Sequence, residues 1–144
     1  MALISVTRLR VRSVFYLPQF FWHTFKVQRQ AKSAPGMLGG RLMLEAHLVF
    51  WTATVWESDA AMRAFRSSGA HMRAMPKLLD WCDEASYVHW EQESAELPSW
   101  AEAHRRMVTD GKLSKVKNPS AAQSAKKFPE PRHGGSEGQR LNPA

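Results

Sequence analysis

Hydrophobic and polar positions alternate in several segments of the chain, and a period of two predicts β-strands with one covered face. In residues 3–12, arginines at alternate positions are interleaved with apolar side chains that point the other way. Residues 38–47 and 85–92 alternate in a similar manner. Residues 49–56 are rich in β-branched and aromatic side chains, and both faces of this segment are apolar, which indicates a strand covered on both sides.

Two helices are predicted near the ends of this region. Apolar residues at helical spacing predict a helix from residue 17 to about residue 32, which residues 34–36 (Ala-Pro-Gly) end. After Pro98, residues 99–102 match a capping box and predict a short helix that runs to Val108.

A further helical segment lies between the predicted strands 49–56 and 85–92. Residues 57–59 supply an N-cap for it, and residues 67–69 (Ser-Ser-Gly) should bend or interrupt it. It then continues over residues 70–81, where Pro76 predicts a kink.

The order of these elements is β-α-β-β-α-β, which predicts a ferredoxin-like α+β fold. Two right-handed β-α-β crossovers, interleaved in this way, place both helices on one face of a four-stranded antiparallel sheet. The opposite face is then bare, although the apolar character of residues 49–56 indicates that it does not meet water. A second copy packed sheet against sheet would cover it, so we expect a homodimer.

The net charge of +7 is unevenly distributed. Residues 1–98 contain eleven Lys and Arg against nine Asp and Glu, whereas residues 99–144 contain nine against four. After residue 111 apolar residues are few and aperiodic, and such a segment cannot offset its ordering entropy. We therefore expect one domain over residues 1–110, including its short C-terminal helix, and a disordered basic tail over residues 111–144. The tail would be solvating or weakly attracted to phosphates, and no specific nucleic-acid binding is expected.

Several protein classes are excluded by what the sequence lacks. It has no nucleotide-binding loop, no His-Glu-x-x-His, no Gly-x-Ser-x-Gly and no Cys-x-x-Cys. Cys82 stands alone, which excludes a disulfide framework and a Cys-based metal site. No run reaches the ~20 apolar residues of a membrane helix, and arginines follow the apolar start, an order unlike that of a secretory signal. We expect a cytoplasmic location.

His71 is the first candidate for chemistry. It lies one turn from Met75, just after the predicted interruption of the helix. A histidine on an irregular helix that faces a sheet suits a general base, a proton shuttle or an axial haem ligand. The alternative is a partly buried histidine bonded to a backbone carbonyl. Trp51, Trp56 and His89 are likewise open to two interpretations, as core residues or as the lining of an apolar cleft between helix and sheet.

Four segments of the sequence resemble a known group of proteins: residues 39–42 (Gly-Gly-Arg-Leu), 50–57 (Phe-Trp-Thr-Ala-Thr-Val-Trp-Glu), 61–76 and 81–85 (Trp-Cys-Asp-Glu-Ala). Over about residues 1–105 the chain resembles an uncharacterised bacterial family related to the antibiotic-biosynthesis monooxygenases of the dimeric α/β-barrel superfamily. It is also distantly similar to spheroidene monooxygenase. The resemblance implies a ferredoxin-like domain that dimerises.

The resemblance also implies candidate site residues. His71 matches the haem-associated histidine of spheroidene monooxygenase and would be the catalytic residue and the ligand of a haem iron. Trp51, Trp56 and Trp81 would line the pocket. Arg41 or Arg73 would steer an anionic group such as a haem propionate. The cofactor-free oxygenases of the superfamily use an Asn and a Trp, but this chain has no Asn before Asn118.

Two functions remain open. The first is a monooxygenase-like oxidoreductase, dependent on haem or on no cofactor. The second is a non-catalytic module of the same fold that binds a small apolar or aromatic ligand or mediates dimeric interactions. RNA binding is disfavoured, because residues 49–55 lack the glycine that the third strand of an RNA-recognition motif carries.

Overall fold

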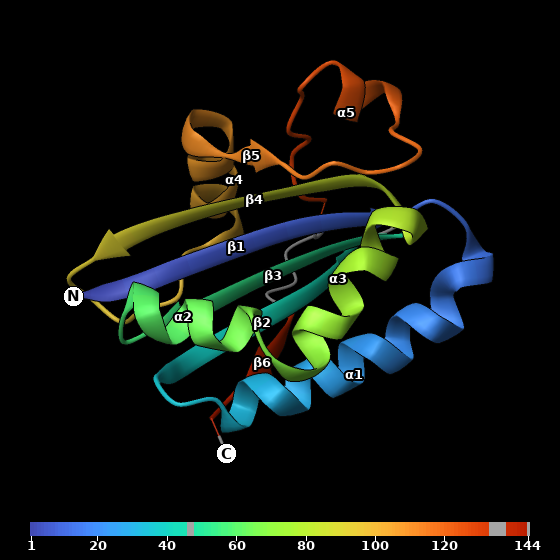
Figure 1. The fold of residues 1–144 in the computed structure, drawn as a ribbon. Coiled ribbons are helices and arrows are strands. Elements are labelled where there is room, and N and C mark those ends of the chain that lie inside the picture. The colour runs from blue at the N-terminus through green and yellow to red at the C-terminus, as the bar shows by residue number, and fades with distance from the viewer. Residues whose placement is uncertain (46–47, 133–137, 144) are drawn as a thin grey trace.

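The structure, a computed structural model, describes residues 1–45, 48–132 and 138–143. One antiparallel sheet has the strand order β5-β4-β1-β3-β2-β6 (Figure 1). The strands are β1 (Ala2–Val11), β2 (Met37–Glu45), β3 (Val49–Trp56), β4 (Cys82–Gln92), β5 (Lys112–Leu113) and β6 (Gln139–Leu141). The four longest strands have the predicted ferredoxin-like arrangement, which is confirmed, and a short strand extends each edge.

Helices cover both faces of the sheet. One face carries the short 3₁₀ helix η1 (Val14–Tyr16), α1 (Leu17–Ser33), α2 (Asp59–Arg66) and α3 (Gly69–Trp81) (Figure 1). The other face carries α4 (Trp100–Asp110), while α5 (Ala121–Ser124) lies beyond β4. No helix among the described residues is long and apolar enough to cross a membrane.

The predicted interruption between α2 and α3 is present, and its local chemistry explains it. The hydroxyl of Ser58 caps α2 by accepting a hydrogen bond from the backbone N–H of Ala61 (3.1 Å). The chain then turns at Gly69, whose φ of +58° favours glycine. The side-chain amide of Gln30 donates to the carbonyl of Ser68 (2.8 Å) and thereby attaches this junction to α1.

Strand alternation divides the side chains of the central strands between two different environments. On the α4 face, β3 presents Val49, Trp51, Ala53 and Val55, all buried. On the face toward α1–α3, the same strand presents Phe50 and Trp56 with two threonines between them. The prediction that both faces of residues 49–56 are apolar is therefore wrong for the face that α1–α3 overlie, because threonine favours strands without making them apolar.

The face that the sequence left bare is covered by the chain itself. Trp100, Ala103 and Met107 of α4 are buried against the apolar side chains of β1, β3 and β4, and Phe128 packs beside them. An uncovered apolar face was the physical reason for expecting a sheet-to-sheet homodimer. Since α4 supplies that cover within one chain, the homodimer remains a prediction without this support.

The segment after residue 111 also packs on the domain. The backbone N–H of Lys117 donates to the carbonyl of Leu79 (3.0 Å), and Gln123 is buried. Leu141 of β6 is buried against β2. This differs from the expected disordered tail, because a few side-chain and backbone hydrogen bonds hold a segment that its composition alone would leave unfolded. Residues 133–137 and 144, which belonged to the same prediction, lie outside the described residues.

Two neighbouring residues of α4 test whether this helix covers the sheet. Met107 is fully buried, whereas 56% of Val108 is exposed. We expect Met107→Ala to lower the free energy of unfolding by about 2–5 kcal/mol, because it leaves a cavity in the core. Val108→Ala, the matched control, should change it by less than about 0.5 kcal/mol. Urea denaturation followed by circular dichroism measures both, and equal effects would place α4 away from the sheet.

Candidate functional site

A belt of polar side chains crosses the middle of the sheet on the face toward α2 and α3. Strand register places Ser5 of β1 between Thr54 and His89, and places Thr7 between Thr52 and Tyr87. We call these six residues the polar belt: Ser5, Thr7, Thr52, Thr54, Tyr87 and His89. All six are partly exposed. The sheet therefore offers hydroxyl and imidazole groups at its centre, where a fully covered face would be apolar.

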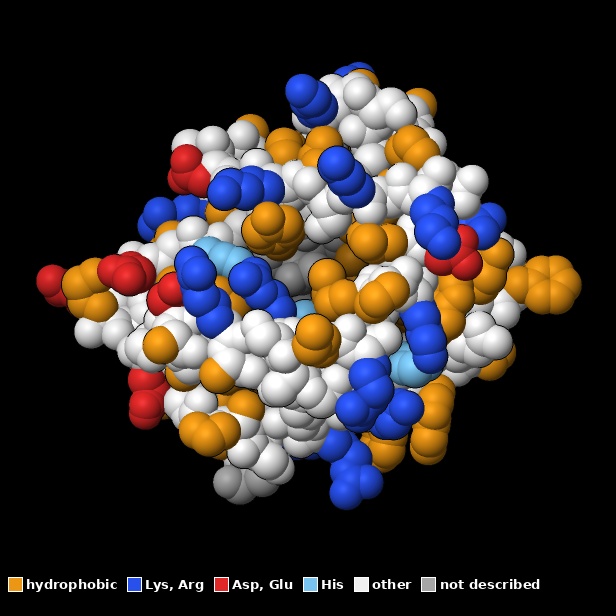
Figure 2. Space-filling view, in the orientation of Figure 1, with side chains coloured by type: hydrophobic (Ala, Val, Ile, Leu, Met, Phe, Trp, Pro, Cys, Tyr) orange, Lys and Arg blue, Asp and Glu red, His pale blue; other side chains and the backbone are white. Residues whose placement is uncertain are grey.

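Apolar clusters close the two ends of this face. Leu3 and Trp56 are buried under Met62 of α2 at one end, and Val11 is buried with Phe20 of α1 at the other. Between these ends the surface is hollowed between the α2–α3 layer and β4, and hydrophobic and basic side chains surround the hollow (Figure 2). The helices bridge the ends of the sheet and leave the polar belt accessible.

His89 is the polar-belt residue best suited to bind a ligand. Neither of its ring nitrogens has a hydrogen-bond partner among the described residues, and its ring lies 5.4 Å from that of Tyr87. Burial lowers the pKa of His89, and the charge of Arg66 lowers it further, with Asp59 opposing and Arg63 and Lys112 adding smaller effects. His89 is therefore a neutral imidazole at pH 7, in surroundings that are mainly cationic.

His71 lies at the start of α3 and is also held neutral. Burial is the main cause that lowers its pKa; the hydrogen bond to the Arg66 carbonyl opposes this, and the Arg66 charge adds to it. The ring Nδ1 lies 3.1 Å from that carbonyl oxygen, so Nδ1 is the donor and Nε2 keeps its lone pair. This bond to a backbone carbonyl is the arrangement that the alternative interpretation described. Since Arg66 influences both pKa values, it links the two histidines electrostatically.

Two tilted aromatic rings, one after the other, pack beside His71. Its ring centroid lies 5.0 Å from that of Phe65, which lies 5.0 Å from Trp56. Trp56 is fully buried, and its indole N–H donates to the Thr54 hydroxyl (2.9 Å). Of the three tryptophans expected to line the pocket, Trp56 therefore contacts both Phe65, which packs against His71, and Thr54 of the polar belt.

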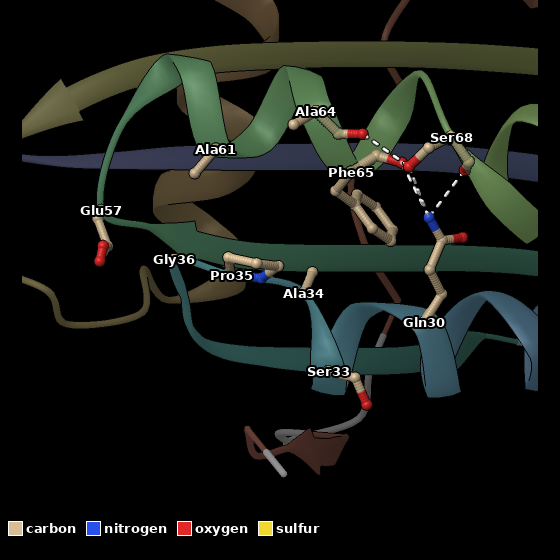
Figure 3. Close-up of a pocket in the computed structure, with 10 residues that line it drawn as sticks. All are labelled: Gln30, Ser33, Ala34, Pro35, Gly36, Glu57, Ala61, Ala64, Phe65 and Ser68. Carbon is tan, nitrogen blue, oxygen red and sulfur yellow. Dashed lines mark hydrogen bonds between the residues drawn. The ribbon is translucent and has the colours of Figure 1, made fainter.

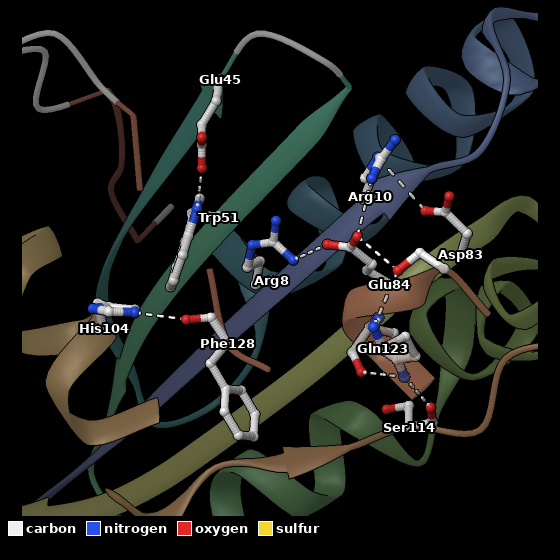
Figure 4. Close-up of polar contacts among 12 residues, drawn as sticks. Arg8, Arg10, Glu45, Trp51, Asp83, Glu84, His104, Ser114, Gln123 and Phe128 are labelled. Carbon is white, nitrogen blue, oxygen red and sulfur yellow. Dashed lines mark hydrogen bonds and ion pairs between the residues drawn. The ribbon is translucent and has the colours of Figure 1, made fainter. Parts of the chain in front are cut away.

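Other predicted site residues do not join this cluster. Trp51 is fully buried on the α4 face, where its indole N–H donates to Glu45 (2.6 Å; Figure 4). Arg41 pairs in register with Ala53 and so belongs to that same face. The sheet therefore separates both residues from His71. Trp81 lies at the far end of α3, where its ring centroid is 5.4 Å from that of His23. Arg73 is exposed on α3.

The surroundings of His71 do not fit a haem. A macrocycle requires a broad apolar cleft, whereas the sheet face beneath α2 and α3 carries the hydroxyls of Ser5, Thr7, Thr52 and Thr54. The tryptophans that were expected to form apolar walls are dispersed, with Trp51 beyond the sheet. Although Nε2 of His71 is available, the residues around it are better suited to a ligand that itself forms hydrogen bonds.

A separate pocket of about 550 Å³ opens between the end of α1, the start of β2 and α2 (Figure 3). Phe65 lines it and also contacts His71, so this side chain stands between the pocket and the histidine. Glu57 is the one ionisable residue in its lining. A single carboxylate offers no acid–base pair, so the polar belt is the stronger candidate for chemistry.

The polar belt could have been found in the sequence. Ser5 and Thr7 alternate with apolar residues in β1, and Thr52 and Thr54 do so in β3. Polar residues at alternate positions in two strands that are expected to pair indicate a shared polar face. In residues 49–56 the aromatic side chains on both faces mask this pattern.

The sequence matches the model of one protein family. Residues 16–130 match the family described as a domain of unknown function, DUF3291. The chain belongs to this family. The match extends through α5, so it includes part of the segment that was expected to be a tail. No curated protein matches the chain.

Solved structures, among them an antibiotic-biosynthesis monooxygenase, share the fold. A Nitrosomonas europaea protein provisionally named as such a monooxygenase aligns with a TM-score of 0.57 at 14% identity, over 64% of this chain and 90% of that chain. SnoaB, a cofactor-independent oxygenase from Streptomyces nogalater, gives 0.54 at 14% identity, over 65% and 94%. Rv0793 from Mycobacterium tuberculosis gives 0.58 at 9% identity, over 65% and 97%. These similarities confirm the predicted resemblance and the fold.

The neutral histidines predict a loss of stability in mild acid. Burial lowers the pKa values of His71 and His89 below 6.5 in the folded state. The unfolded chain then binds more protons than the folded chain, so the free energy of unfolding falls as the pH drops below about 6.5. We expect His71→Gln/His89→Gln to lose less stability than the wild type between about pH 7.5 and pH 5 in urea titrations. An unchanged pH dependence would show that neither imidazole is held neutral.

The poor fit to haem predicts the result of a hemin titration. We expect wild type and His71→Ala to give the same visible absorption spectrum with hemin, because His71 lacks an apolar cleft in which a haem could reach it. A sharp Soret band in the wild type that shifts or disappears in the variant would contradict this expectation and would place His71 on a haem iron.

Proposed function

We propose that the protein is a monooxygenase-like oxidoreductase that binds a small hydroxylated aromatic substrate over the polar belt. The observation that carries the proposal is the open row of hydroxyl and imidazole groups across β3, β1 and β4. Hydrogen-bonding groups that are partly exposed and flanked by buried apolar clusters are typical of sites that orient a ligand. Phe65, which is partly exposed and packs on the buried Trp56, supplies aromatic surface beside them.

The chemistry proposed for the site begins with a proton transfer. A neutral His89 accepts a proton from a substrate hydroxyl, whose electron pair remains on the oxygen and is delocalised into the ring. The cationic side chains of Arg63 and Arg66 stabilise the resulting anion. An electron-rich anion of this kind is a better reductant of dioxygen than the neutral substrate. One oxygen atom of dioxygen bonds to a ring carbon, which loses its hydrogen, and the other leaves as water. The substrate supplies all four electrons as it becomes a quinone.

The shared fold supports this proposal. SnoaB shares the fold and is a cofactor-independent oxygenase. In this chain the hydroxyl of Thr52 would provide a hydrogen-bond donor in place of the Asn that the sequence lacks before Asn118, whereas the Thr54 hydroxyl donates to the Ser5 carbonyl (3.5 Å). The nature of the site thus follows from its own side chains and not from a shared motif.

Substitution of His89 tests the binding step. We expect His89→Gln to weaken binding of 2-naphthol roughly tenfold, because the imidazole would no longer accept its hydroxyl proton. His104→Gln is the matched control, since His104 of α4 bonds to the Phe128 carbonyl (2.7 Å; Figure 4) on the opposite side of the sheet. Isothermal titration calorimetry measures both affinities, and equal affinities would remove His89 from the site.

Oxygen uptake with 1,4-dihydroxynaphthalene then separates the two functions that the fold allows. Uptake above the rate without protein, reduced in His89→Gln but not in His104→Gln, would support an oxidoreductase. Binding of 2-naphthol without any protein-dependent uptake would instead identify a non-catalytic ligand-binding module and overturn the proposed activity.

A further inference from the structure

An exposed aromatic ridge runs along η1 and the outer side of α1. It consists of Val14, Phe15, Phe21, Trp22 and Phe25, with Phe15 87% and Trp22 59% exposed. Half of the exposed large hydrophobic side chains in the described residues thus fall within residues 14–25. Exposed apolar side chains that gather in this way mark an interaction surface, whereas scattered ones do not.

Basic side chains accompany the ridge. Lys26 lies 5.5 Å from the ring centroid of Trp22, and Arg29 lies 5.9 Å from that of Phe25. Lys32 follows one turn later and is exposed. No acidic residue occurs in residues 1–44, so α1 itself carries no negative charge. Across the helix layer, Asp80 pairs with Arg12 (3.6 Å) before the start of α1, and Glu57 lies beside Gly36 after its end.

The ridge is convex. Trp22 and Phe25 stack at 6.2 Å with 22° between their planes, and Arg29 and Lys32 continue the same stripe along the helix. Neither the pocket at the end of α1 nor the pocket beside β2 includes a ridge residue. Figure 2 shows hydrophobic and basic side chains projecting together at the lower right, over α1.

We propose that this surface docks the protein on a membrane that contains anionic lipids. Aromatic and basic side chains on one helix face are the combination that inserts into the headgroup region while the cations contact lipid phosphates. Trp22 and Phe25 would enter the headgroup boundary, and Lys26 and Arg29 would remain at its charged surface. The helix would lie along the membrane and would not cross it.

The charge of the surface favours a membrane over a second copy of the chain. A two-fold interface through α1 would bring Lys26 and Arg29 toward the same residues of the other copy without any acid of α1 to balance them. Projecting rings also favour a deformable apolar medium, which the headgroup and acyl boundary of a membrane supplies. This inference is independent of the proposed oxidoreductase function.

Vesicle co-sedimentation tests the proposal with the full chain. We expect binding to vesicles with about 30% phosphatidylglycerol, little binding to phosphatidylcholine alone, and release in about 0.5 M NaCl. Trp22→Ala/Phe25→Ala should lower the partition coefficient at least about tenfold, although it retains every charge. Leu44→Ala/Val108→Ala, which removes two exposed hydrophobic side chains elsewhere, is the matched control and should bind as the wild type does.

The variant also distinguishes the ridge from the basic C-terminal segment. Equal binding by wild type and Trp22→Ala/Phe25→Ala would assign any vesicle binding to charge alone and overturn the proposal, as would the absence of binding to anionic vesicles. Sedimentation velocity completes the test. A dimer that the variant abolishes, in a protein that binds no vesicles, would assign the ridge to a second copy and would equally overturn the proposal.

Discussion

Antiparallel pairing of β1 between β3 and β4 is the constraint on which the rest of the structure depends. Once this register is set, alternate side chains must point to opposite faces. Ile4 and Val6 then enter the core beneath α4, while Ser5 and Thr7 face α2 and α3. A shift of one residue would bury the hydroxyls and expose the core. The same register therefore secures both the stability of the domain and the composition of its candidate site.

A buried charge cluster shows how the C-terminal segment becomes part of this domain. Arg8 bonds to Glu84 (2.6 Å) on the α4 side of the sheet, and Arg10 (3.0 Å) and the Ser120 hydroxyl (2.8 Å) bond to the same carboxylate (Figure 4). Burial raises the pKa of Glu84, but these bonds outweigh it and hold that pKa below its usual range. An uncompensated buried charge is costly. The segment after α4 thus completes the solvation of a group within the sheet.

The sequence predicts the central architecture well because periodicity reports which faces are covered. The capping serines and the break at Gly69 were also predictable, because each depends on residues within a few positions along the chain. It predicts the site less well. His71 was identified and lies beside Phe65, which contacts Trp56. Trp51 was expected to line the same pocket as Trp56, but residues five positions apart in one strand point to opposite faces of the sheet. Order after residue 111 arises from individual long-range hydrogen bonds, which composition does not encode.

The side chain of Gln123 has a consequence for the solubility of the folded chain. Its amide accepts from the backbone N–H of Ala85 (3.1 Å) and donates to the carbonyls of Ala85 (3.3 Å) and Ser114 (2.8 Å). Its side-chain carbonyl thereby pairs the backbone N–H of Ala85 in β4, beyond the two-residue strand β5, while the Ala85 carbonyl also accepts from the N–H of Ser114 (2.9 Å). Unpaired strand edges recruit strands from other molecules and begin aggregation. Gln123 therefore blocks this part of the β4 edge, so that a strand of another molecule cannot pair with it.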